Sequence, residues 1–129
     1  MSRWTNVSTS IEELLGKTLV NIVVSKDKDI ILFESSDGYK YQMLHHQDCC
    51  ESVTIDDIVG DVNDLLNSPI TIAEERVNDR KEDDYGYGST WTFYTLATVK
   101  GYVDIKWFGT SNGYYSESVN FELIKDDEI

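Results

Sequence analysis

The sequence has little positive charge and no long apolar run. It contains 11 Lys and Arg residues against 24 Asp and Glu, which gives a formal net charge of −13. Direct binding to nucleic acid depends on clustered Lys and Arg, so it is not expected here. Binding to an anionic membrane surface is disfavoured for the same reason. No stretch approaches the roughly 20 apolar residues of a membrane span, and residues 1–6 contain no apolar signal segment.

Cysteine is equally scarce, with only the neighbours Cys49 and Cys50. A bond between adjacent residues would close a strained ring, and no third cysteine offers another partner. The sequence therefore predicts two free thiols, which are typical of a reducing compartment. Together with the lack of a signal segment, this predicts a cytoplasmic protein.

What the chain does contain is strand-forming sequence along most of its length. With 129 residues, of which 40% are hydrophobic, it is expected to form a single domain over residues 1–129. Alternation in the last third sorts Trp91 and Phe93 onto one face of a strand, and Val103, Ile105 and Trp107 onto one face of the next. Runs rich in β-branched and aromatic residues predict strands at 18–24, 30–34, 39–45, 70–77, 90–99, 102–107 and 115–123, with 53–55 as a further extension.

Turn and capping signals complete the expected fold. Asp37-Gly38 and Asn112-Gly113 predict hairpin turns. Short helices are predicted at 10–15, where Ser10 and Glu13 form a capping box, and at 62–66 after Asp61. The fold class is thus α+β: mainly antiparallel β-sheet, two meanders of about six to seven strands, and one or two short helices. Two segments are expected to be loose, a mobile loop at 79–88 and a frayed tail at 125–129.

One string in the middle of the chain is unusual: His45-His46-Gln47-Asp48-Cys49-Cys50-Glu51-Ser52-Val53. Together with the blocks Thr-Trp-Thr-Phe-Tyr at 90–94 and Ser-Asn-Gly-Tyr-Tyr-Ser-Glu-Ser-Val at 111–119, it resembles a family of small phage-encoded proteins of unknown function, over roughly residues 38–121. The resemblance implies expression in a host cytosol. It favours a protein that binds and disables a host component, and it supplies no activity.

The same string holds imidazole, carboxylate and thiolate groups, the common ligands of transition metals. On a strand, His46, Asp48 and Cys50 would share one face, and His45 and Cys49 the other. The usual spaced ligand pairs are absent, so neither a metal site nor a catalytic residue is assigned. Two interpretations stay open. Either the cysteines are buried packing residues and the histidines are satisfied by hydrogen bonds, or residues 45–50 form the centre of a metal- or thiol-dependent enzyme.

Tyrosines in predicted loops suggest a pocket. Tyr114 and Tyr115 follow a turn, and aromatic rings of this kind can sandwich a nucleobase. The alternative is that these tyrosines only complete the packing at the surface of the sheet. A phosphate would also need a cation, for which Arg80 is one of five candidates in the second half of the chain. The residues assigned to this candidate pocket are His45, His46, Asp48, Tyr114, Tyr115, Ser116 and Glu117.

No Lys or Arg occurs between Tyr41 and Glu75. The carboxylates of this interval lack the spacing of a calcium loop. They are either a solvated surface, with Asp61 as a helix cap, or a face that docks on a basic protein in a salt-sensitive way. The residues assigned to this acidic face are Glu51, Asp56, Asp57, Asp61 and Asp64.

Together these patterns favour a binding protein over an enzyme. The hypothesis is a phage-type protein that inhibits a host defence or metabolic component by sequestration, through a small-nucleotide pocket or through the acidic face. The enzyme centred on residues 45–50 is the alternative. No cofactor is assigned. The expected partner is a host protein or a small nucleotide-like ligand, and the sequence is compatible with a homo-oligomer.

Overall fold

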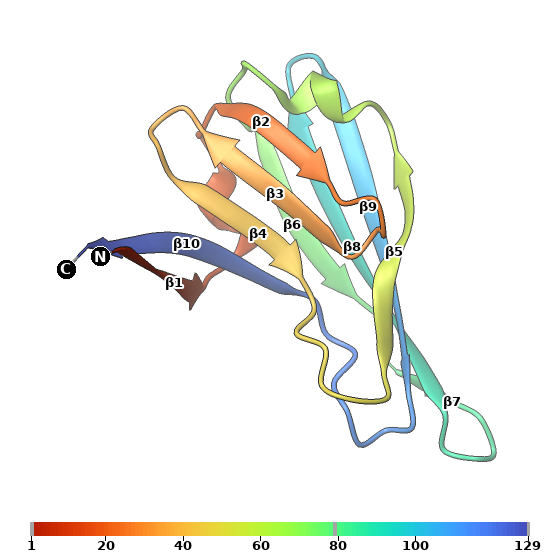
Figure 1. The fold of residues 1–129 in the computed structure, drawn as a ribbon. Coiled ribbons are helices and arrows are strands. Elements are labelled where there is room, and N and C mark those ends of the chain that lie inside the picture. Colours follow the sequence, from red (N-terminus) through yellow and green to blue (C-terminus); the bar gives the residue numbers. More distant parts are fainter. Residues whose placement is uncertain (1, 79, 129) are drawn as a thin grey trace.

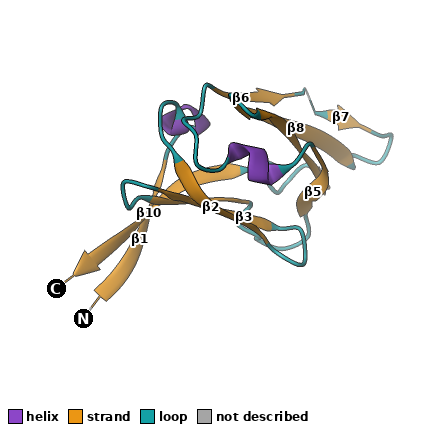
Figure 2. Ribbon diagram, turned by 90° about the horizontal axis from the view of Figure 1, so that it is seen from above, coloured by secondary structure: helices purple, strands orange, loops and turns teal. Residues whose placement is uncertain are grey.

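Two antiparallel sheets form the protein, and their inner faces pack against each other (Figures 1 and 2). The computed structural model describes residues 2–78 and 80–128. The first sheet has the order β1 (Ser2–Ser8), β10 (Asn120–Glu128), β4 (Lys40–Leu44), β3 (Ile30–Ser35) and β2 (Leu19–Val24). The second has the order β5 (Ser52–Val59), β9 (Gly101–Ser111), β8 (Gly88–Thr98) and β6 (Ile72–Val77), with β7 (Lys81–Glu82) also paired to β8.

The prediction of a mainly antiparallel β fold is confirmed. The α part of the predicted α+β class is wrong, because the described residues contain no α-helix. The helices expected at 10–15 and 62–66 are single 3-10 turns, η1 (Ile11–Leu14) and η2 (Val62–Leu65). Segments this short lie below the length at which an α-helix propagates. Asp61 caps η2 as predicted, and its carboxylate accepts a bond from the backbone N–H of Asn63 at 2.9 Å. No helix in the described part of the chain is long and apolar enough to cross a membrane.

The meander β2–β3–β4 and the hairpin β8–β9 are present as predicted. The last strand differs from the prediction of 115–123. β10 starts only at Asn120, and it inserts between β1 and β4 in the first sheet. Two meanders therefore become two interlocked sheets of about ten strands. Residues 125–128, expected as a frayed tail, pair with β1. The interval 79–88 contains β7, and Asp79 lies outside the described residues.

The core lies between the two sheets. Trp107 is fully buried, and its indole N–H points at the sulfur of Met43 in the opposite sheet, 3.2 Å away. Trp91 and Phe93 share one face as predicted, and it is the outer one. Register explains this: Thr92 pairs with the inward-facing Trp107, so its neighbour Trp91 must point outward. There Trp91 packs against Phe108, with ring centroids 4.5 Å apart.

Topology brings two loops together at one end of the sandwich. The chain crosses from β4 to β5 through residues 45–51 and returns from β9 to β10 through residues 112–119. Leu44 pairs with Asn120, and Ser52 pairs with Thr110. The two crossover loops therefore start and finish beside each other, as the lower part of Figure 1 shows.

Candidate functional site

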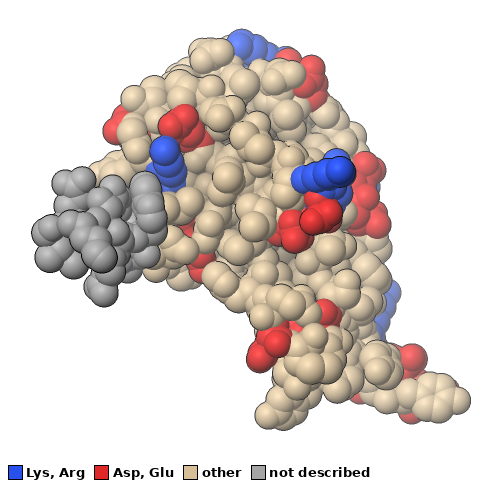
Figure 3. Space-filling model, viewed as in Figure 1, with Lys and Arg blue, Asp and Glu red and all other residues tan. Residues whose placement is uncertain are grey.

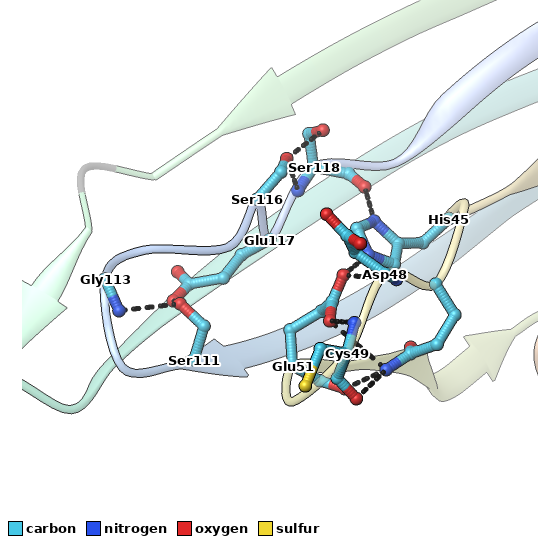
Figure 4. Close-up of polar contacts among 10 residues, drawn as sticks. His45, Asp48, Cys49, Glu51, Ser111, Gly113, Ser116, Glu117 and Ser118 are labelled. Atoms are coloured by element: carbon cyan, nitrogen blue, oxygen red, sulfur yellow. Dashed lines mark hydrogen bonds and ion pairs between the residues drawn. The ribbon is translucent and has the colours of Figure 1, made fainter.

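The first crossover loop is organised around the carboxylate of Glu51 (Figure 4). One oxygen accepts bonds from His45 Nε2 at 2.8 Å and from the backbone N–H of Asp48 at 2.9 Å. The other accepts the backbone N–H of Cys49 at 2.9 Å. The hydrogen bond from His45, helped by the backbone donors, outweighs burial and lowers the pKa of Glu51 to about 2. Glu51 is buried in its own loop, so its assignment to an exposed acidic face was wrong.

His45 connects the two crossover loops. Its Nδ1 lies 2.7 Å from the carbonyl oxygen of Ser118, while Nε2 faces Glu51. The side chain is 4% exposed. Both ring nitrogens are therefore occupied by protein groups, and neither is free to bind a ligand or to activate a thiol. His45 is a connector between the loops rather than a ligand-binding group.

The other members of the His-Cys string point elsewhere. His46 Nε2 lies 2.6 Å from the carboxylate of Glu122 on β10. Burial raises the pKa of Glu122, but hydrogen bonds from Gln42 and His46 outweigh it and hold this pKa below its ordinary value. Asp48 is exposed. Among the residues that the structure describes, no three His, Cys, Asp or Glu side chains converge as a metal site.

The two cysteines were predicted as free thiols, with burial in the core as one interpretation, and both expectations were wrong. Cys49 and Cys50 are bonded to each other, and both are exposed. The loop turns around Glu51, which accepts the backbone N–H of Cys49, and both cysteine side chains are exposed to solvent. Because the chain has no other cysteine, each of these two exposed thiols can form a disulfide within the molecule only with the other.

A hollow of about 370 Å³ lies beside the second crossover loop, where the inner face of β6 and β8 is left uncovered. Of the predicted ligand-binding residues, Tyr115, Ser116 and Glu117 line it. Tyr114 is 84% exposed and packs edge-on against Tyr115, with ring centroids 4.9 Å apart. We call this hollow the groove; its lining is Glu75, Val77, Arg80, Thr90, Thr92, Gly113 and Tyr115 to Val119.

An ion pair between half-buried Arg80 and buried Glu117 forms one wall of the groove. Arg80 Nε donates to Glu117 at 3.1 Å, and Nη2 donates to the carbonyl oxygens of Gly86 and Ser111 at 3.2 and 3.1 Å. Its Nη1 pairs with Glu82. The Glu117 carboxylate also accepts the hydroxyl of Thr90 at 2.6 Å, and that of Ser111.

Burial raises the pKa of Glu117, but the bonds from Ser111, Thr90 and Arg80 outweigh it and hold this pKa below its ordinary value. The carboxylate is therefore ionised at neutral pH, and it neutralises Arg80 directly. Neither charge of this pair is left over for a ligand.

Two glycines make room for this pair. A Cβ at Gly88 would lie 2.3 Å from the guanidinium carbon of Arg80, and one at Gly109 would lie 2.9 Å from the backbone oxygen of Glu117. Sequence reasoning missed the contact between Arg80 and Glu117. An isolated glycine within a strand often marks the close approach of another group, so Gly88 and Gly109 were the available signal.

The remaining residues of the predicted acidic face do not adjoin the groove. Asp56 and Asp57 are exposed on the edge strand β5, at a bulge between Ile55 and Asp57. Charges and bulges on an edge strand discourage pairing with other chains. Asp61 and half-buried Asp64 belong to η2, at the end opposite the crossover loops (Figure 1). On the face in Figure 3, acidic side chains form separate groups, some beside a Lys or Arg.

Fold and site together define an antiparallel β-sandwich whose two crossover loops are joined by His45, with an open groove beside the second loop. Residues 12–121 match a family described as a domain of unknown function (DUF7448), and the chain belongs to this family. The matched range includes both loops and the groove. Comparison with curated proteins and with solved structures finds no match.

Proposed function

We propose that this is a binding protein that sequesters a basic partner protein by holding a Lys or Arg side chain in the groove. The observation that carries the proposal is the charge of the lining. Arg80 is the only Lys or Arg there, and Glu117 neutralises it directly. Glu75 is exposed and has no ion pair among the described residues. Its carboxylate therefore gives the groove lining a net negative charge.

The rest of the molecule supports the same partner. A net charge of −13 attracts basic proteins over several ångströms and speeds their association, with a strong dependence on ionic strength. The basic side chain would approach through the mouth of the groove, where Tyr115 offers an aromatic face to a cation. The hypothesis of an acidic face that binds a basic protein is thereby moved from β5 and η2 to the groove.

The nucleotide pocket receives less support. A phosphate needs a free Arg or Lys, or the N-terminus of a helix. The guanidinium of Arg80 already donates to four acceptors, so it offers no free fork to a phosphate. The enzyme alternative is also weakened, because His45 and His46 bind separate carboxylates. A phage setting and a host defence target belong to the proposal, and they rest on the sequence resemblance alone.

The test uses a defined probe, a short fluorescent oligo-arginine peptide, and measures its affinity by anisotropy at several salt concentrations. Glu75→Gln should weaken binding by up to about fivefold, since a partly exposed ion pair contributes about 0.2–1 kcal/mol. Glu74→Gln is the matched control. Glu74 is the next residue on β6 and faces the other side of the sheet, so the same charge change there should have little effect.

Equal losses in the two variants would show only general attraction between a peptide and an acidic protein, and would refute the groove as the binding site. A mononucleotide serves as the second probe. Saturable mononucleotide binding that is lost in Tyr115→Ala would instead support the nucleotide pocket.

A further inference from the structure

The exposed Cys49–Cys50 disulfide does not line the groove. We propose that this pair is a thiol–disulfide exchange site, which low-molecular-mass thiols such as glutathione reduce and which glutathione disulfide reoxidises. The inference does not depend on the proposed function. It rests on the placement of the two side chains and on the way the loop beneath them is held.

Access is the first argument. Both residues are exposed, whereas disulfides that only stabilise a fold are commonly shielded from thiols. The chain has no other cysteine, so the pair cannot exchange within the molecule. Any exchange must therefore involve an external thiol or disulfide.

The second argument is that the backbone of the loop does not depend on the sulfur–sulfur bond. Glu51 holds the backbone N–H groups of Asp48 and Cys49, each at 2.9 Å. The loop ends are fixed by the pairs Leu44 with Asn120 and Ser52 with Thr110. Opening the disulfide thus leaves the two thiols adjacent on the same anchored turn, ready to close again.

The reaction balances with glutathione as the only co-reactant. Its thiolate attacks one cysteine sulfur, the bond between Cys49 and Cys50 breaks, and the other sulfur leaves as a thiolate and takes up a proton. A second glutathione attacks the mixed disulfide and releases glutathione disulfide and the second protein thiol. The protein gains two electrons and two protons, and two glutathione molecules lose them. Oxidation follows the same steps in reverse, with the neighbouring thiol resolving the mixed disulfide.

The experiment equilibrates the native protein in buffers with stepped ratios of glutathione to glutathione disulfide, quenches with acid, alkylates with iodoacetamide and records intact masses. Wild-type protein should give two species, an unalkylated disulfide and a doubly alkylated dithiol, which interconvert without denaturant. A protein that stays a dithiol at every ratio, or that is reduced only after unfolding, would overturn the proposal.

Cys49→Ser and Cys50→Ser give the matched comparison. Each leaves one exposed thiol without a neighbour to resolve the mixed disulfide. Each variant should accumulate the glutathione adduct in the oxidising buffers, at least tenfold more than wild-type protein does. Equal adduct levels in wild type and variants would mean that the pair does not act as a unit, and would refute the exchange site. The wild-type titration stands even if a variant folds poorly.

Discussion

His45 and Ser118 lie on different crossover loops, and the Nδ1 atom of His45 is 2.7 Å from the carbonyl oxygen of Ser118. A carbonyl oxygen only accepts hydrogen bonds, so Nδ1 must carry a hydrogen. On the other side of the ring, Nε2 faces the ionised carboxylate of Glu51, which also only accepts. Both bonds are made together only when His45 is an imidazolium.

This protonation state can be measured directly. In protein labelled with ¹⁵N at histidine, both ring nitrogens of His45 should show the shifts of N–H groups. Glu51→Gln replaces the ionised acceptor beside Nε2 with an amide and should change the Nε2 signal. A single-tautomer neutral ring in the wild-type protein would contradict the hydrogen-bond assignment. His46, whose ring is 57% exposed, is the internal comparison.

Stability in acid should depend on Glu51. Its pKa falls from an ordinary value of 4.5 to about 2 in the folded protein. A depressed carboxyl pKa contributes stability that is fully present above the unfolded value and is lost as pH falls through the folded one. The melting temperature should therefore drop between pH 4.5 and about 2, and Glu51→Gln should flatten this part of the curve. Glu12→Gln, at an exposed site outside the loops, should leave the slope unchanged.

Arg80→Lys should destabilise the wall of the groove. A lysine cannot reproduce the planar fork that reaches Glu117, Gly86 and Ser111 at once. Leaving these acceptors unsatisfied should cost about 1–3 kcal/mol in urea unfolding. Arg76→Lys is the matched change at an exposed site, where the guanidinium lies over Phe93. Its cost should stay at about 0.5–1 kcal/mol, and equal costs for the two variants would contradict the bridging role of Arg80.

Two tryptophans test the orientation of the second sheet. Trp107→Ala removes a fully buried ring that spans the two sheets, and it should cost about 3–5 kcal/mol. Trp91→Ala removes an outer-face ring packed on Phe108, and it should cost about 0.5–1.5 kcal/mol. The free energies of unfolding of the two variants are compared by urea denaturation, with circular dichroism as the signal. A larger cost at Trp91 would mean that the inner and outer faces are exchanged.

Local signals predicted most of the strand positions and little of the site. The Asp37-Gly38 turn and the alternation of Val103, Ile105 and Trp107 depend on neighbours in sequence, and both were read correctly. The prediction of α-helices was wrong because capping signals mark where a helical turn starts and do not set its length. Glu51 was misplaced because an acidic residue in a polar string gives no local sign that its own loop will bury it.

The sequence by itself determined a β-rich domain with a strong negative charge, because composition and side-chain alternation are properties of short segments. Only the tertiary structure decided where the site lies. β10 leaves the hairpin that precedes it and pairs with β4, where Gln42 and Glu122 are 80 positions apart in the sequence, so that two crossover loops run side by side. That pairing brings His45 to Ser118, and the return of the chain over Gly109 brings Glu117 to Arg80. Neither contact is encoded within any one segment, because each depends on long-range strand pairing.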